Sequence, residues 1–144
     1  MKIHKFENIY PRTFWVANCS KEHPWELTKK FNFYENTPGW QELATGINNE
    51  LDNASFTSIA ACYPVEEKAT GKIGVILIIF QNNEMGSSLI AHESVHIADY
   101  FYEACGCNSE DFTDGNEAYA YLVGWAAGCI ANVLIKERNG KTTA

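Results

Sequence analysis

The chain has 144 residues, of which 46% are hydrophobic and 20% charged, so it can bury a core and is too apolar for a disordered protein. Its 11 Lys and Arg residues against 18 Asp and Glu give a formal net charge of −7, which argues against nucleic acid or an anionic membrane as a partner. The amino terminus lacks the apolar run of a signal peptide, and the five cysteines are scattered and odd in number. We therefore expect a cytoplasmic protein with reduced thiols.

The first third of the chain predicts short elements. Aromatic and β-branched residues predict a strand over 13–17. Pro24, at a plausible first helical position, predicts a helix over 25–31, and a weaker helical pattern covers 41–51. No repeat or linker interrupts the sequence. We expect one domain over 1–138 and a flexible tail over 139–144.

Two runs rich in β-forming residues, 55–65 and 72–80, are separated by a loop of hairpin length that ends in Gly71. This pattern predicts an antiparallel strand pair. The second run is continuously apolar from Ile73 to Phe80, so we expect protein to cover both of its faces.

Helical periodicity begins at Ser87 and continues to Gly106, a good C-terminal cap. A polar connector follows, and a second helix is predicted over 116–138. Its segment 118–135 has no charged residue, but its length is at the lower limit for a membrane span, so we expect a buried helix rather than a membrane anchor. Small residues along this helix indicate close packing by another element (Ala120, Gly124, Ala127, Gly128 and Ala131). Strands followed by two helices predict an α+β fold.

The sequence His92-Glu93-Ser94-Val95-His96 is an H-E-x-x-H motif within the first of these helices. Residues four apart on a helix differ by about 40° around the axis, so His92 and His96 can bind one metal ion. Glu93 lies next to that face and can reach a water on the ion, as a general base must. The motif therefore predicts a catalytic zinc site.

A catalytic zinc ion usually takes a third protein ligand, and Glu117 at the start of the second helix is our candidate. Glu117 also satisfies a capping box with Asp114, which is the structural alternative. Asp99 could bind the ion or support a histidine by hydrogen bonding, and we favour support. Cys105 and Cys107 are weaker candidates, because their spacing is not C-x-x-C.

The residues from His92 to Tyr100, followed by Asn116-Glu117-Ala118, resemble the zincin metallopeptidases of the gluzincin type, such as thermolysin and the minigluzincins. The resemblance covers about 72–128. It implies a small, mostly antiparallel sheet, an active-site helix with both histidines and a second helix that supplies the glutamate. It also implies that the strand 73–80, or the edge near it, pairs with an extended substrate; a buried central strand is the alternative.

The sequence differs at several positions from the metzincins and from the thermolysin-like enzymes. Asp99 and Tyr102 stand where metzincins have glycine and a third histidine, which excludes that branch. Tyr121 stands where thermolysin-like enzymes have an aspartate that supports a ligand, so Asp99 or Asn116 would have to take that role. Thermolysin-like enzymes also have a large separate domain that carries a catalytic histidine, and we expect no counterpart of it in a chain of this length. Tyr119, Tyr121 or another hydroxyl would have to stabilise the transition state.

We therefore expect a zinc-dependent metallopeptidase that acts on a peptide or protein, with Zn²⁺ on His92, His96 and Glu117 and with Glu93 as general base. A catalytically inactive zincin-fold protein with a binding or structural role is the alternative.

Overall fold

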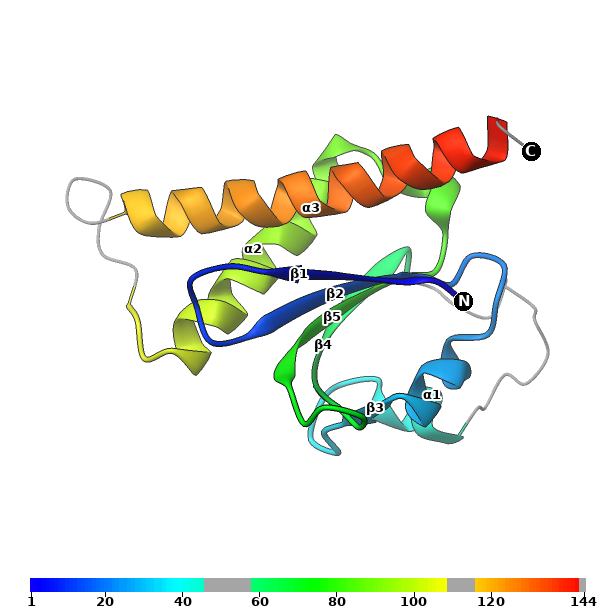
Figure 1. The fold of residues 1–144 in the computed structure, drawn as a ribbon, viewed down its shortest axis with the longest axis horizontal. Helices are drawn as coiled ribbons and strands as arrows, with labels where there is room; N and C mark the ends of the chain where they lie inside the picture. The colour runs from blue at the N-terminus through cyan, green and yellow to red at the C-terminus, as the bar shows by residue number, and fades with distance from the viewer. Residues whose placement is uncertain (46–57, 109–115, 143–144) are drawn as a thin grey trace. The chain divides into compact units, whose positions relative to one another are not determined.

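The computed structural model describes residues 1–45, 58–108 and 116–142. Within these residues the strands all precede the two long helices (Figure 1). The chain divides into two compact units, Met1–Met85 with the sheet and Gly86–Ala144 with the long helices. The α+β class expected from the sequence is confirmed, and the single-domain organisation stays a prediction.

The first unit is built on a five-stranded mixed sheet with the strand order β1-β2-β5-β4-β3. β2 and β5 pair in parallel, and the other three pairings are antiparallel. The predicted antiparallel pair is therefore confirmed as β4 and β5. The strands are β1 (Ile3–Glu7), β2 (Thr13–Asn18), β3 (Phe31–Phe33), β4 (Ala60–Glu67) and β5 (Ile73–Ile79).

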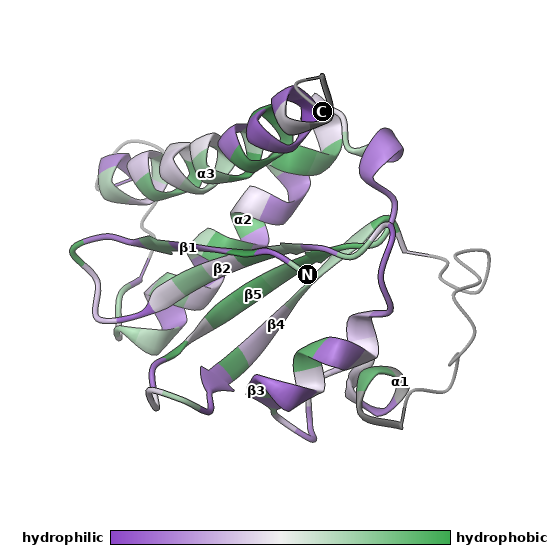
Figure 2. Cartoon of the chain, turned by 45° about the vertical axis from the view of Figure 1, so that its right-hand side comes forward, coloured by the Kyte–Doolittle hydropathy of each residue, from purple (hydrophilic) through white to green (hydrophobic). Residues whose placement is uncertain are grey.

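β5 is the central strand, and its apolar sequence explains this position. Residues 74–79 are all buried, which confirms that both faces of this run are covered, and Figure 2 shows β5 as a largely hydrophobic strand. β5 pairs with β2 on one side and β4 on the other, so both of its edges are used. β5 itself therefore has no free edge for a substrate, and the alternative of a buried central strand is confirmed. The edge strands are β1 and β3, and pairing of a substrate with an edge stays a prediction.

One face of the sheet carries the main core of the first unit. The Trp15 and Phe31 rings meet edge to face with centroids 5.0 Å apart, and Leu27 and Leu43 join the same cluster from two short helices. These helices are the 3₁₀ helix η1 (Pro24–Lys29) and α1 (Trp40–Thr45). The core residues are Trp15, Ala17, Cys19, Leu27, Phe31, Phe33, Leu43, Tyr63, Val65, Ile76, Ile78 and Phe80.

Gly74 of β5 leaves no space for a side chain beside β2. A Cβ atom at this position would lie 1.8 Å from the carbonyl oxygen of Thr13 and 2.8 Å from the Trp15 ring. No other residue type fits here without displacing the backbone of β2. The glycine therefore permits the parallel pairing at the centre of the sheet.

The short elements agree only in part with the sequence prediction. The strand at 13–17 is confirmed as β2. The helix predicted over 25–31 is a 3₁₀ helix that ends at Lys29, because Phe31 already belongs to β3. The helix predicted over 41–51 is described only as α1, and 46–57 lie outside the described residues. β1 and β3 were not predicted.

The second unit contains α2 (Ser87–Ala104) and α3 (Glu117–Thr142), with the 3₁₀ helix η3 (Asn82–Glu84) just before it in the first unit. Gly106 has φ +70°, the left-handed conformation expected of a C-terminal cap, so the predicted end of α2 is confirmed. α3 runs past its predicted end at residue 138. The predicted tail over 139–144 is thus helical as far as Thr142.

Aromatic side chains join the two long helices. Phe101 and Trp125 meet edge to face with centroids 5.7 Å apart, and Tyr102 and Tyr119 do so at 5.1 Å. Gly124 and Gly128 lie elsewhere on α3, on an exposed side where an added Cβ would meet nothing within 4 Å. Within the described part of the second unit, no element therefore packs closely at Gly124 and Gly128. For Ala120, Ala127 and Ala131 close packing stays a prediction.

The segment Glu117–Gly140 of α3 is long and apolar enough to cross a membrane by length and composition alone, with a mean hydropathy of 1.6. One third of its apolar window is buried within the protein (33%). A core helix of a soluble protein passes the same test, so a single helix of this kind is weak evidence for a span. The absence of a membrane partner stays a prediction.

Candidate functional site

The two motif histidines meet on the exposed side of α2. Their Nε2 atoms are 3.1 Å apart, and the ring centroids are 4.8 Å apart with the ring planes at 77°. Two nitrogens that bind one tetrahedral zinc ion at 2.0–2.1 Å are themselves about 3.3–3.4 Å apart. The spacing of His92 and His96 therefore suits two ligands of one ion. It also suits a direct hydrogen bond between the two rings in the absence of metal.

Glu93 is buried, unlike the two histidines. It is 5% exposed, and Ser94 and Ile97 on the same side of α2 are fully buried. Around the helix axis Glu93 is about 100° from His92 and about 60° from His96, so it lies beside the face that carries the imidazoles. Its role as general base stays a prediction.

Glu117 is the first residue of α3, and its side chain is exposed. Within 1–45, 58–108 and 116–142, no three His, Cys, Asp or Glu residues gather as a metal site would require. The structure thus brings together His92 and His96 but not the third ligand expected from Glu117. The same finding gives no support to a site at Cys105 and Cys107. Asp114, the alternative capping partner of Glu117, lies outside the described residues.

Asp99 and Tyr119 form a contact that the sequence analysis did not predict. The Tyr119 hydroxyl donates a 2.6 Å hydrogen bond to Oδ1 of Asp99, one turn after His96. Desolvation by burial, followed by this hydrogen bond and the negative charge of Asp99, raises the pKa of Tyr119 to about 12. Tyr119 therefore stays protonated at neutral pH as a hydrogen-bond donor. Both residues were candidates for the site, and the structure pairs them with each other; in the described part of the chain neither forms a hydrogen bond with a histidine.

The remaining two candidates lie at the start of α3. Tyr121 is 75% exposed and therefore lies on the outside of the helix. Asn116 precedes the helix, and its backbone carbonyl accepts a 2.9 Å hydrogen bond from the amide of Ala120. Its Oδ1 atom is buried without a hydrogen-bond partner in the described part of the chain. Support of a histidine by Asn116, and stabilisation of a transition state by Tyr121, both stay predictions.

Comparison with known proteins returns nothing: no family model, curated protein or solved structure matches this chain.

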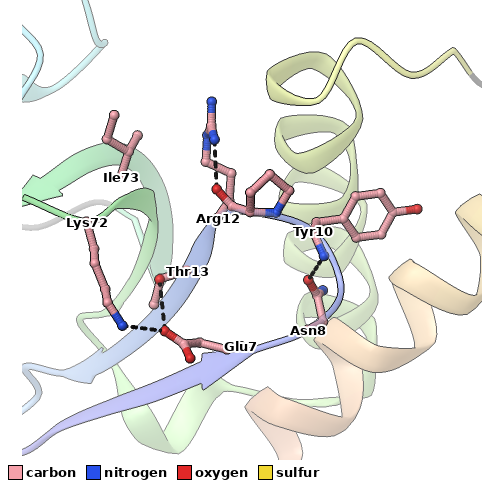
Figure 3. Close-up of a pocket in the computed structure, with 8 residues that line it drawn as sticks. Glu7, Asn8, Tyr10, Arg12, Thr13, Lys72 and Ile73 are labelled. Carbon is pink, nitrogen blue, oxygen red and sulfur yellow. Dashed lines mark hydrogen bonds and ion pairs between the residues drawn. The ribbon is translucent and has the colours of Figure 1, made fainter.

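The structure contains a pocket in the first unit that the sequence did not predict. It lies where the turn between β1 and β2 meets the start of β5, and it is lined by residues that include Arg12 and Lys72 (Figure 3). Asn8 and Pro11 in the sequence indicate a turn here, but residues so far apart in the chain give no periodic signal of a shared cavity.

Proposed function

We propose that this chain is a zincin-like, zinc-dependent hydrolase of peptide bonds. The observation that carries the proposal is the 3.1 Å separation of the His92 and His96 Nε2 atoms within an H-E-x-x-H sequence on one helix. Two ligands at this spacing on a rigid element are half of a tetrahedral site. The α+β order, with strands before the two helices, is compatible with the gluzincin resemblance.

Within this proposal the residues of the chain have separate roles. His92 and His96 hold the ion through Nε2, and a bound zinc ion would supply a water of lowered pKa and polarise the substrate carbonyl. With zinc bound there, Glu93 would be the group that accepts a proton from the water and returns it to the leaving amine. Glu117 remains the proposed third ligand, although the described structure does not bring it to the histidines.

A second candidate is a catalytically inactive zincin-fold protein that binds a partner or has a structural role. Two observations favour it. The described residues contain no three-residue metal group, and Glu93 is buried, with 5% of its surface exposed, whereas both histidines are exposed. A site with two histidine ligands binds metal more weakly than a full catalytic set.

Zinc binding is tested by calorimetry on the full chain, with His92→Ala and His96→Ala as the ligand variants. We expect each variant to weaken zinc binding at least tenfold. Glu117→Gln should weaken it by a similar factor if this carboxylate completes the site. Unchanged zinc affinity in Glu117→Gln would remove it from the ligand set, and unchanged affinity in both histidine variants would refute the metal site.

Catalysis is tested by incubating the zinc-loaded chain with a mixture of peptides and identifying the products by mass spectrometry. Glu93→Gln should keep zinc and lose cleavage, whereas Glu103→Gln, an exposed glutamate on the same helix, should cleave normally. Equal cleavage by wild type and Glu93→Gln would refute the assigned base. Zinc binding without cleavage of any peptide by the wild type would favour the second candidate.

A further inference from the structure

Two cysteines lie on either side of Gly106, the residue at which the chain turns away from the end of α2. Cys105 and Cys107 are both half-buried, and Gly106 between them is exposed, with nothing within 4 Å of the position that a Cβ atom would take. All five cysteines of the chain are free thiols in the structure. Cys105 and Cys107 are therefore two thiols, one residue apart, at an accessible bend.

Backbone hydrogen bonds hold this bend in one conformation. The amide of Cys107 donates a 2.8 Å hydrogen bond to the carbonyl of Tyr102, and the amide of Gly106 donates one of 3.2 Å to the carbonyl of Glu103. Together with the left-handed glycine at φ +70°, these two bonds form a Schellman motif, which closes the C-terminus of a helix. The end of α2 thus fixes the backbone on both sides of the glycine.

The Cys107 thiol points back toward residue 105. Its Sγ lies 3.9 Å from the backbone carbonyl oxygen of Cys105. A disulfide needs Cα atoms 4.4–6.8 Å apart. Two Cα atoms on either side of a residue with helical dihedral angles, right-handed or left-handed, are about 5.4 Å apart. The bend therefore suits the spacing of a disulfide, and one thiol already points toward the other residue.

The other three cysteines are not placed for exchange with a neighbouring thiol. Cys19 and Cys129 are buried, with 1% and 6% of their surfaces exposed. Cys62 is half-buried on β4, a strand with no second cysteine. Accessibility and a close second thiol in the sequence thus occur together at Cys105 and Cys107.

A disulfide that spans a single residue suits reversible chemistry better than a permanent structural role. A short loop gains little stability from closure, because closure removes little entropy from the unfolded chain. Strained or exposed disulfides have more oxidising potentials than structural ones, and they are the labile and regulatory class. A bond between Cys105 and Cys107 would be short and partly exposed, so it belongs to that class.

We propose that Cys105 and Cys107 form a reversible dithiol–disulfide site that exchanges with low-molecular-weight disulfides such as glutathione disulfide. The thiolate of one cysteine attacks a sulfur of the small disulfide, forms a mixed disulfide and releases one glutathione thiolate. The thiolate of the second cysteine then attacks the first cysteine's sulfur, closes the Cys105–Cys107 bond and releases the second glutathione thiolate. The protein loses two electrons and two protons, and the small disulfide becomes two thiols. The proposal does not depend on the metal site.

The test equilibrates the full chain, with EDTA present, in mixtures of reduced and oxidised glutathione. Acid quenching, blocking of free thiols with N-ethylmaleimide and mass spectrometry of non-reduced peptides then locate each bond. We expect the peptide with both cysteines to lose two hydrogen atoms, in a proportion set by the glutathione ratio and independent of protein concentration. Dithiothreitol should restore the two thiols. A glutathione adduct that persists on either wild-type cysteine without closure would refute the proposal, as would a bond to another cysteine or to a second chain.

Variants separate the two steps of the exchange. Cys105→Ser and Cys107→Ser each keep one thiol, so the reaction should stop at the mixed disulfide, and the glutathione adduct should accumulate at least tenfold over wild type. Cys62→Ser is the matched control, because Cys62 is also half-buried but lies in the first unit. It should close the Cys105–Cys107 bond to within twofold of wild type. No more adduct in either single-thiol variant than in wild type would refute the two-step exchange.

Comparison of the folded and unfolded chain tests whether the helix end presents the two thiols. We expect the equilibrium constant for closure in glutathione buffer to be at least tenfold larger for the native protein than for the protein in concentrated urea. The reason is that the Schellman motif holds the bend that the unfolded chain must form. An equal or smaller constant in the native protein would overturn the proposal, because closure would then be a property of the Cys-Gly-Cys sequence alone.

Discussion

The Tyr119 hydroxyl and the Asp99 carboxylate form a 2.6 Å hydrogen bond that joins α3 to α2 one turn after the motif histidine His96. The contact lies beside the edge-to-face pair of Tyr102 and Tyr119, so polar and aromatic interactions fix the same point between the helices. Any change in the spacing of the two helices at this end must break it. Substitutions that remove this hydrogen bond therefore test how much it contributes to the packing of α2 against α3.

Tyr119→Phe should lower the free energy of unfolding by about 1 kcal/mol, because it removes this hydrogen bond between partly exposed groups and keeps the ring. Tyr121→Phe is the matched control, since Tyr121 is 75% exposed and its hydroxyl faces solvent. Urea denaturation followed by circular dichroism measures both. Equal stability of the two variants would show that the hydrogen bond contributes nothing.

The pKa of about 12 makes Tyr119 the group to follow in alkaline titration. The folded pKa lies above the ordinary value of 10.0, so the stabilising contribution is complete below pH 10 and is lost as the pH rises toward 12. The difference in ultraviolet absorbance between wild type and Tyr119→Phe isolates this phenol. Asp99→Asn should lower its pKa, but not fully to 10, because burial is the larger cause. Ionisation of Tyr119 near pH 10 in the wild type would contradict the prediction.

Gly74→Ala should destabilise the first unit by about 3 kcal/mol or prevent folding, because the added Cβ would lie 1.8 Å from the Thr13 carbonyl oxygen. Gly124→Ala should instead increase the stability of the protein. It lies on α3 with nothing within 4 Å, so alanine should stabilise the helix by about 0.5–1 kcal/mol. Thermal denaturation of both variants tests the contrast, and a well-folded Gly74→Ala would show that β2 and β5 separate more easily than the structure implies.

Cys129 should be the slowest of three thiols to react with iodoacetamide at pH 8. Burial raises the pKa of its thiol to about 11, and its side chain is 6% exposed, so little thiolate is accessible. Cys105 and Cys107 are half-buried and should react sooner. Mass spectrometry of labelled peptides gives the three rates, and denatured protein provides the reference in which they converge. Equally fast labelling of native Cys129 and Cys105 would contradict this order.

The sequence predicted best those features that depend on local pattern. The continuously apolar run 73–80 predicted a strand covered on both faces, and residues 74–79 are buried. Gly106 was predicted to end α2, and its backbone is left-handed. The helical spacing of four residues was enough to bring His92 and His96 together. β3 was missed because Phe31-Asn32-Phe33 is too short for its alternation to outweigh the helical signal before it.

Relations between separate elements were not predictable in the same way. A separation of 20 residues between His96 and Glu117 allows a meeting of the two side chains but does not impose one, and the described structure does not bring them together. The Asp99–Tyr119 hydrogen bond and the Arg12–Lys72 pocket depend likewise on how elements pack. No periodicity along the chain encodes such contacts.

The parallel pairing of β2 with β5 sets an order on folding. Thr13 lies opposite Gly74, so the middle of the sheet closes only after η1, β3, α1 and β4 have been added to the chain between them. During synthesis β1 and β2 leave the ribosome before β5, so the inner edge of β2 stays unpaired until β5 follows. We therefore expect slow refolding of the first unit, with a rate governed by this one long-range closure, and early exposure of an edge that a chaperone would recognise.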